Sequence, residues 1–196
     1  MKKIVTLLGS PRANGNSAAI AGRFMETAKT YGAETKTYSL NKLKFRGCQA
    51  CMMCKDKLDR CALKDDLEPV LDDIRDADVL VLASPVYFAD ITAQMKMFID
   101  RTYSYYVPDF MNNPVPGRLP LGKQLIFIQT QAQPEENFFN DIYPKYEFFF
   151  QFLGFKDNHL IRATGVNDEG DAEKQESIMK HAENLAAQIM NHSPES

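Results

Sequence analysis

The regular alternation of strand-like and helix-like segments limits the fold of this chain more than any other feature. Residues 3–9 and 78–83 are apolar runs, residues 34–39 alternate polar and apolar side chains, and residues 124–129 and 159–163 form two further strand patterns. Helix patterns occupy residues 17–31, 91–103, 138–155 and 172–191, and a further helix opens at Asp65. A break is expected near Pro144 in the segment 138–155. Such alternation predicts a parallel sheet with helices on its faces.

We therefore predict an α/β fold of three layers around a doubly wound, five-stranded parallel sheet with the strand order 2-1-3-4-5. In such a sheet, ligands bind beyond the carboxyl ends of the strands. Asp65 and Glu68 have the spacing of a capping box at the start of the second helix, and Pro69 falls in its first turn. A length of 196 residues suits a single domain, residues 1–196.

The charge of the chain argues against two classes of partner. Its net charge is −3 and its isoelectric point is about 5.7, so nothing indicates binding to nucleic acid or to an anionic membrane surface. The apolar run at residues 4–8 is too short for a secretory signal, and no segment approaches the roughly 20 apolar residues of a membrane span. We expect a cytoplasmic protein, whose cysteines are reduced and available for metal or redox chemistry.

The first strand runs into a loop, GSPRANGNS at residues 9–17, that leads into a helix. Small and hydroxyl residues at this point suit a phosphate group, because backbone N–H groups and the helix N-terminus converge there. The spacing of Gly9 and Gly15 does not fit a Walker A loop, Asn16 stands in place of its lysine, and the G-x-G-x-x-G pattern of dinucleotide sites is missing. The loop predicts a site for a single phosphate, the alternative being that Ser17 only caps the helix.

The third strand ends in SPVYFAD at residues 84–90, and the helix that follows contains QMKMFIDR at residues 94–101. A Pro-Val-Tyr-Phe turn at the carboxyl end of a central strand offers a planar ring an apolar wall and a few polar groups. The same residues could also form a tight turn over core aromatics. A third loop, TQAQP at residues 130–134, follows the fourth strand.

All four cysteines lie in the loop after the second strand, as Cys48, Cys51, Cys54 and Cys61. Four thiolates can hold a [4Fe–4S] cluster or a tetrahedral zinc ion. The even C-x2-C-x2-C spacing is typical of iron–sulfur ligation, whereas zinc sites usually separate two C-x2-C pairs by a longer stretch. Reactive thiols or a transient disulfide are the third possibility.

These motifs together resemble the NADPH-dependent FMN reductase and iron–sulfur flavoprotein group of flavodoxin-like proteins, over roughly residues 1–165. For the FMN phosphate, the resemblance implies four binding residues in the first loop: Ser10, Arg12, Asn16 and Ser17. For the isoalloxazine ring it implies six residues in the other two loops: Pro85, Val86, Tyr87, Phe88, Thr130 and Gln131. It implies the four cysteines as ligands of a [4Fe–4S] cluster. Ala132 departs from the family, which often has a glycine in this stretch.

The resemblance implies an FMN-dependent oxidoreductase that passes electrons from NADH, NADPH or another reduced donor to a small-molecule or protein acceptor, through the cluster where one is present. The alternatives are a quinone or nitro-aromatic reductase with an idle cysteine loop, a non-enzymatic electron carrier, and a thiol redox sensor. No residue identifies itself as a catalytic base. Because the second strand neighbours the first in the predicted order, we expect the cysteine loop at the same sheet edge as the flavin.

Two segments, residues 103–110 and 138–150, hold more aromatic side chains than one helix face each can bury. Exposed aromatic surface tends to mark interfaces, and the family that the chain resembles is typically oligomeric. We therefore expect a homodimer or homotetramer, unless these side chains fill the core.

Overall fold

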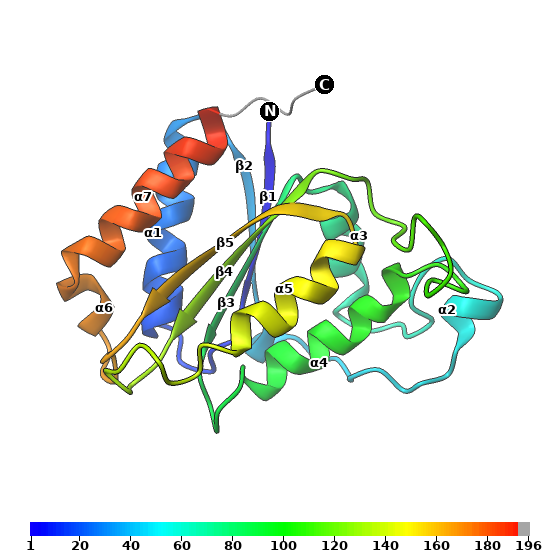
Figure 1. The fold of residues 1–196 in the computed structure, drawn as a ribbon, viewed down its shortest axis with the longest axis horizontal. Helices are drawn as coiled ribbons and strands as arrows, with labels where there is room; N and C mark the ends of the chain where they lie inside the picture. Colours follow the sequence, from blue (N-terminus) through cyan, green and yellow to red (C-terminus); the bar gives the residue numbers. More distant parts are fainter. Residues whose placement is uncertain (192–196) are drawn as a thin grey trace.

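The computed structural model describes residues 1–191, which form a five-stranded parallel sheet between two layers of helices (Figure 1). The strand order is β2-β1-β3-β4-β5, as predicted. Every neighbouring pair of strands is parallel. The strands are β1 (Lys3–Leu8), β2 (Glu34–Ser39), β3 (Val79–Pro85), β4 (Lys123–Thr130) and β5 (Phe155–Ala163).

Each face of the sheet has its own hydrophobic core. On one face, Val79 and Val81 of β3 pack with α1 (Asn16–Thr30) and α7 (Glu176–Asn191), which the short α6 (Asp171–Lys174) precedes. On the other, Leu80 and Leu82 pack with α3 (Glu68–Asp76), α4 (Ala93–Arg101) and α5 (Ile142–Phe152). Figure 1 shows these two layers on either side of the sheet. Successive residues of a strand point to opposite faces, so one apolar run serves both cores.

Several predicted boundaries are wrong, and each has a local cause. The second predicted helix is α3, and it begins at Glu68 instead of Asp65. The Asp65 carboxylate binds Arg101 and does not take part in a capping box. Pro144 does not break α5, because it lies in the first turn, where the missing N–H costs little. The fifth strand begins earlier, at Phe155, and its polar residues are tolerated because β5 lies at the sheet edge.

The sequence also gave no indication of three short elements. Two 3₁₀ helices, η1 (Leu40–Lys42) and η2 (Thr102–Tyr105), follow β2 and α4 directly. The short helix α2 (Met53–Asp56) lies among the cysteines. The closing helix is divided at Gln175, whose backbone is not helical and whose side chain donates to Thr164 O at 2.9 Å.

Among residues 1–191, no helix has both the length and the apolar character needed to cross a membrane.

The irregular segment 106–122 packs closely against the turn that precedes β5. Gly154 in this turn has a φ of +109°, and a Cβ placed there would lie 2.7 Å from Pro120 O. Both the left-handed backbone and the close approach therefore require glycine at this position.

We expect Gly154→Ala to lower the free energy of unfolding by about 1–3 kcal/mol, because alanine is strained at this φ and its methyl group collides with the Pro120 carbonyl. The matched control is Gly22→Ala in α1, where nothing lies within 4 Å of the added Cβ. It should raise the stability by about 0.5–1 kcal/mol. Urea unfolding of both variants measures the difference, and equal stabilities would contradict the account.

Candidate functional site

The loops after β1 and β3 meet at the carboxyl edge of the sheet through Thr92. Its Oγ1 donates to Gly9 O at 2.8 Å and accepts from Met95 N at 3.3 Å, so Thr92 caps α4 and holds the first loop at once. A Cβ on Gly9 would lie 2.9 Å from this oxygen, so the approach requires glycine. Sequence reasoning missed Thr92 because the helix was expected to begin at residue 91, although threonine is a usual cap residue.

The predicted phosphate loop, residues 9–17, buries Ser10 and Ser17 and leaves Arg12 exposed. Helix α1 starts after Gly15, which has an extended backbone (φ −71°, ψ 158°). Within residues 1–191, no side chain caps this helix start. The N–H groups of a first helical turn lack partners within the helix, and they attract anions. The local structure therefore suits a phosphate group.

Two of the residues predicted for the phosphate hold another loop in place. Asn16 Nδ2 donates to Asp168 O at 3.0 Å, and its Oδ1 accepts from Ala172 N at 3.0 Å. Arg12 Nη1 donates to Asn167 O at 2.9 Å, on an exposed side chain that can reorient. The Asn16 amide therefore connects the phosphate loop to the segment after β5, a contact between distant residues that local sequence does not reveal.

The ring loop, residues 84–90, is a tight turn at the end of β3. Tyr87 N donates to Asp90 O at 2.8 Å, and Asp90 N donates back to Tyr87 O at 3.1 Å. The two residues between them have left-handed backbones, with φ of 47° at Phe88 and 65° at Ala89, the conformation of a type I′ turn. Phe88 is fully exposed at the tip of this turn, and the turn projects below the sheet in Figure 1.

Asp90 fastens the ring loop to α5. Its carboxylate accepts from Lys145 Nζ at 2.7 Å and from Tyr146 Oη at 2.9 Å. Burial acts to raise the pKa of Asp90, but the bonds from Lys145, Ile91 and Tyr146 outweigh it, so the pKa lies below its ordinary value. Asp90 therefore stays ionised and keeps the loop attached at neutral pH.

The loop after β4 lies next to the ring loop. Pro85 pairs with Thr130 in the sheet, and Val86 N donates to Thr130 O at 2.8 Å. Gln131 is buried, and its Oε1 accepts from Arg162 Nε at 3.1 Å, while its Nε2 donates to the Gln133 carbonyl at 3.2 Å. The Gln131 side chain thus shapes its own loop, and its backbone is paired as well: its N–H donates to Ala163 O and its carbonyl accepts from Val166 N, both at 3.0 Å. The three loops predicted for FMN do meet at one edge.

The cysteine loop, residues 43–64, extends from the sheet edge along α4. It leaves the sheet edge after η1 and runs along α4 to the end of that helix remote from the ring loop (Figure 1). Arg101 Nε at that end donates to Cys61 Sγ at 3.0 Å. Since α4 has nine residues, its length is about 13 Å. The loop therefore starts at the predicted sheet edge, and Cys61 lies at the opposite end of α4.

All four cysteines line one cavity of about 710 Å³, which lies between the cysteine loop, α4, η2 and α5 and extends to Asp90 of the ring loop. They are free thiols: Cys48 and Cys51 are exposed, and Cys54 and Cys61 are half-buried. Within residues 1–191, no three His, Cys, Asp or Glu side chains are grouped closely enough to hold a metal ion. The four thiols are thus the right type of ligand for a metal centre and share one cavity. They lie farther apart than the ligands of a closed metal site.

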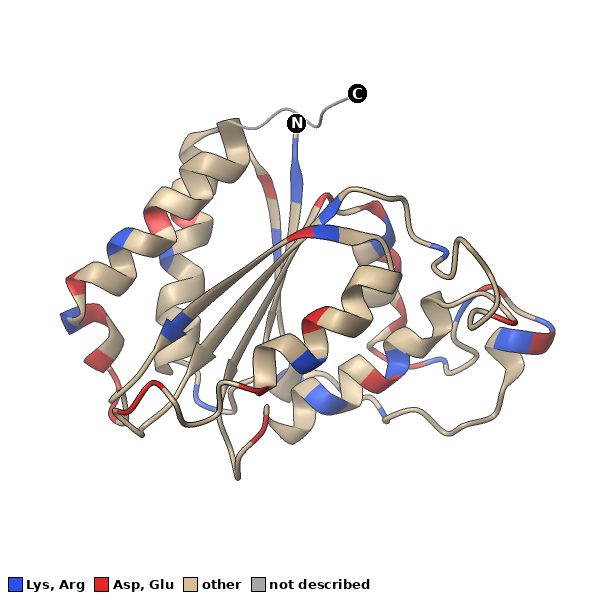
Figure 2. Cartoon of the chain, in the orientation of Figure 1, with Lys and Arg blue, Asp and Glu red and all other residues tan. Residues whose placement is uncertain are grey.

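Cations surround this cavity and bind its backbone. Lys55 Nζ donates to Tyr103 O at 2.6 Å and to Tyr106 O at 2.7 Å, and burial lowers the pKa of Lys55. Arg118 Nη1 donates to Cys54 O at 3.0 Å. Figure 2 shows basic positions on α2 and along the loop beside it. Neither Lys55 nor Arg118 pairs with a carboxylate within the described residues, so no ion pair offsets the charge of either side chain.

Comparison with known proteins decides the family. Residues 2–133 match the family model described as NADPH-dependent FMN reductase. The chain belongs to this family. It is 33% identical over 138 residues to an iron-sulfur flavoprotein of Methanocaldococcus jannaschii. This match covers 70% of this chain and 71% of the relative. It is 35% identical over 121 residues to an iron-sulfur flavoprotein of Methanosarcina thermophila, with 61% and 63% covered, so the match spans less than two thirds of that relative.

The fold of this FMN reductase family member is also found among solved structures. An FMN-dependent NADH-azoreductase of Bacillus anthracis, solved in complex with FMN, superposes with a TM-score of 0.71 at 18% identity, over 97% of this chain and 100% of that one. The predicted flavodoxin-like fold is confirmed, as is the resemblance to the family. The family is one of FMN-dependent NAD(P)H oxidoreductases, which confirms the prediction of an enzyme of this class.

Proposed function

We propose that this chain, as one FMN-binding domain over residues 1–196, transfers electrons from a reduced nicotinamide through FMN and a [4Fe–4S] cluster to an acceptor. The observation that carries the proposal is the meeting of three loops at one sheet edge, joined by one helix to a cavity lined by four free thiols. We further propose that it works in the cytoplasm, where thiols stay reduced.

The phosphate loop supports FMN. The free start of α1 and the buried Ser10 and Ser17 suit one phosphate group, which Arg12 can reach by leaving the Asn167 carbonyl. For the ring we propose Pro85, Val86, Tyr87, Phe88, Thr130 and Gln131. Bound there, FMN supplies the ability to accept two electrons as hydride and release them singly. The protein binds the phosphate, fixes the ring loop through Asp90 and excludes water from one side of the ring.

The cysteine cavity supports an anionic metal centre. Four thiolates around a [4Fe–4S] core leave a net negative charge, which Lys55 and Arg118 can balance without carboxylate partners of their own. The backbone is left-handed at Met52 and helical from Met53, and such alternation turns successive N–H groups to one side, as in many iron–sulfur sites. We propose Cys48, Cys51, Cys54 and Cys61 as ligands.

One observation favours a second candidate function. The wide arrangement of the four thiols, two of them exposed, also suits an FMN oxidoreductase whose cysteines react as free redox thiols. The two candidates differ in their iron content and in the reactivity of the thiols.

We expect FMN to co-purify with the protein, and Arg12→Ala combined with Ser17→Ala to weaken FMN binding at least about tenfold. Each charge-assisted hydrogen bond that is lost contributes about 1.5–3 kcal/mol. Fluorescence titration of the flavin measures the dissociation constant. The control is Arg23→Ala, which removes a half-buried, ion-paired charge from α1, the helix that contains Ser17, and should leave the affinity unchanged. Wild-type affinity in the double variant would show that the phosphate binds elsewhere.

Replacing any of the four cysteines by serine should remove most of the iron from anaerobically purified protein. FMN should stay bound, since the phosphate and ring loops follow other strands. One-electron transfer to an external acceptor should then be lost, while reduction of the flavin by its donor continues. Iron and flavin assays on each variant test this. Wild-type protein without iron, whose thiols alkylate readily, would support the second candidate instead, and stoichiometric zinc would refute both.

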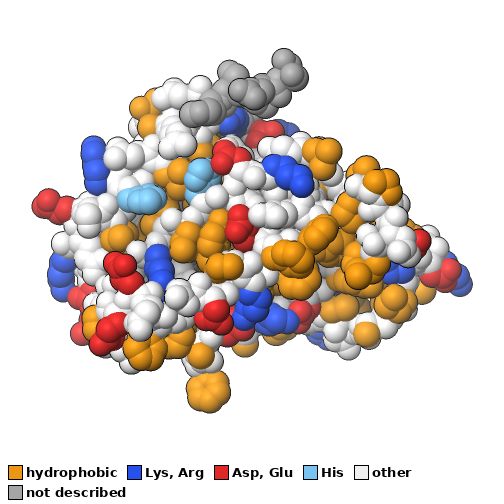
Figure 3. All heavy atoms as spheres, viewed as in Figure 1, with side chains coloured by type: hydrophobic (Ala, Val, Ile, Leu, Met, Phe, Trp, Pro, Cys, Tyr) orange, Lys and Arg blue, Asp and Glu red, His pale blue; other side chains and the backbone are white. Residues whose placement is uncertain are grey.

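We also propose that two or four copies of the chain associate through the outer face of α5. Of the predicted aromatic residues, Tyr105, Tyr106 and Phe150 are buried in the core. Phe148, Phe149 and Phe152 are about half exposed and contact each other, and Figure 3 shows apolar side chains gathered over this helix. Aromatic residues are enriched at protein interfaces.

Light scattering should therefore give at least twice the monomer mass at micromolar concentration. Phe148→Ser with Phe152→Ser should shift the protein towards monomer, because the variant has a polar surface in place of the exposed aromatic one. The control is Tyr31→Ser, an equally exposed aromatic at the end of α1. A wild-type monomer would refute the association.

A further inference from the structure

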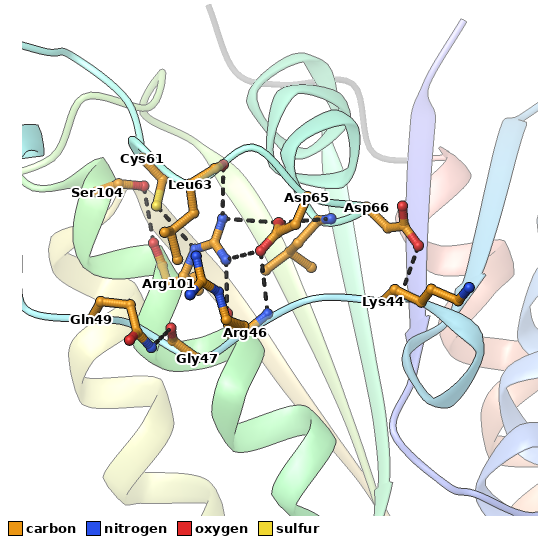
Figure 4. A network of polar contacts seen from close by, with 11 residues as sticks. Lys44, Arg46, Gly47, Gln49, Cys61, Leu63, Asp65, Asp66, Arg101 and Ser104 are labelled. Atoms are coloured by element: carbon orange, nitrogen blue, oxygen red, sulfur yellow. Dashed lines mark hydrogen bonds and ion pairs between the residues drawn. The ribbon is translucent and has the colours of Figure 1, made fainter.

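Arg101 is the last residue of α4 and is only 1% exposed despite its charge. Its Nε donates to Cys61 Sγ at 3.0 Å, and its Nη1 donates to Asp65 Oδ2 and Arg46 O, both at 2.8 Å. Its Nη2 donates to Asp65 Oδ1 at 3.2 Å and to Leu63 O at 3.4 Å. Figure 4 shows the guanidinium enclosed by these groups. Three of its five donors are directed at the cysteine loop, and the other two at Asp65, the residue directly after that loop.

These partners come from both limbs of the loop. Arg46 precedes the first cysteine, whereas Cys61, Leu63 and Asp65 follow the short helix α2. The Arg101 guanidinium therefore holds the two limbs of the loop together and holds both limbs against α4, the helix that follows the ring loop. Only arginine can do this, because its planar fork binds a carboxylate with two N–H groups and still leaves Nε–H for the sulfur.

We propose that Arg101 is the positioning residue of the cysteine loop: it fixes Cys61 in place and donates its Nε–H to Cys61 Sγ when that sulfur is a ligand of the cluster. The second part rests on the proposed function. Hydrogen bonds to the sulfurs help to set the reduction potential of an iron–sulfur cluster. A donor favours the reduced, more negative state, so Arg101 raises the potential.

Arg118 provides a matched comparison. It binds the same loop through Cys54 O at 3.0 Å and also donates to Ser104 O at 2.8 Å. Among the described residues, it donates to carbonyl oxygens and to no sulfur. Arg101→Lys and Arg118→Lys both keep the positive charge, and only the first removes a hydrogen bond to a cysteine sulfur.

The first measurement is hydrogen exchange of cluster-free, FMN-bound protein. Arg101→Lys should increase exchange in residues 44–47 and 61–66 and leave the phosphate loop, residues 9–17, unchanged. Arg118→Lys should act on the segment around Cys54 instead. Unchanged exchange in residues 61–66 of Arg101→Lys would overturn the positioning role. This measurement needs no cluster, so its result does not depend on the proposed function.

The second measurement is a redox titration of the anaerobically reconstituted protein, followed by electron paramagnetic resonance. Arg101→Lys should shift the cluster to a more negative midpoint potential, whereas Arg118→Lys should leave the potential near that of the wild type. Equal potentials in all three proteins, or an equal shift in both variants, would overturn the hydrogen bond to the ligand sulfur. Wild-type protein without iron would contradict the proposed cluster, and the exchange data would still decide the positioning role.

A further variant covers the case in which Arg101→Lys does not fold. Asp65→Asn weakens the ion pair but keeps the Arg101 donor to Cys61 Sγ. It should increase exchange in residues 61–66 and should not make the potential more negative, because the loss of a carboxylate charge acts in the opposite direction. A shift to a more negative potential as large as that expected for Arg101→Lys would contradict a specific role for the bond to sulfur.

Discussion

The buried ion pair between Arg101 and Asp65 is the interaction on which the arrangement of the site depends. The Arg101 side chain is fully buried and that of Asp65 is 12% exposed. A guanidinium in the interior is strongly unfavourable without a partner, and removal of one member of such a pair typically costs about 3–5 kcal/mol. Burial alone would raise the pKa of Asp65, but the bonds from Arg101 and Arg46 keep it below its ordinary value. The pair therefore remains charged, and it fixes the end of the cysteine loop against α4.

Helix α4 thus has a fixed group at each end. Thr92 joins its start to Gly9 of the phosphate loop, and Arg101 joins its end to the cysteine loop. Among the described residues, left-handed backbones occur in both loops that α4 connects, at Phe88 and Ala89 and at Ala50 and Met52. Such strain persists where surrounding contacts determine the conformation, and it gathers at functional sites. One short, rigid helix therefore sets the distance between the two candidate centres.

The sequence predicted the sheet correctly because strands and helices are encoded locally. Apolar runs such as residues 78–83 identify buried strands, and their alternation with helices restricts the possible orders to a few. The phosphate and ring loops were predicted to meet because they follow neighbouring strands, and they do.

What the sequence did not predict depends on contacts between distant residues. The capping box at Asp65 was wrong because its carboxylate binds Arg101, 36 residues away. The same side chain binds Cys61 and so holds the cysteine loop at the end of α4, a position that strand order alone does not specify. Asn16 likewise binds Asp168 and Ala172 across more than 150 positions. Local patterns show which side chains are available, and tertiary packing determines how they are used.

The claim that one chain holds both a flavin and a cluster is tested most directly by assaying FMN, iron and acid-labile sulfide on a single anaerobically purified sample. The account predicts about four iron and four sulfide atoms for each FMN, as a [4Fe–4S] centre requires. A sample with stoichiometric FMN but neither iron nor sulfide would contradict it, because the four thiols and the cations around them would then hold no cluster.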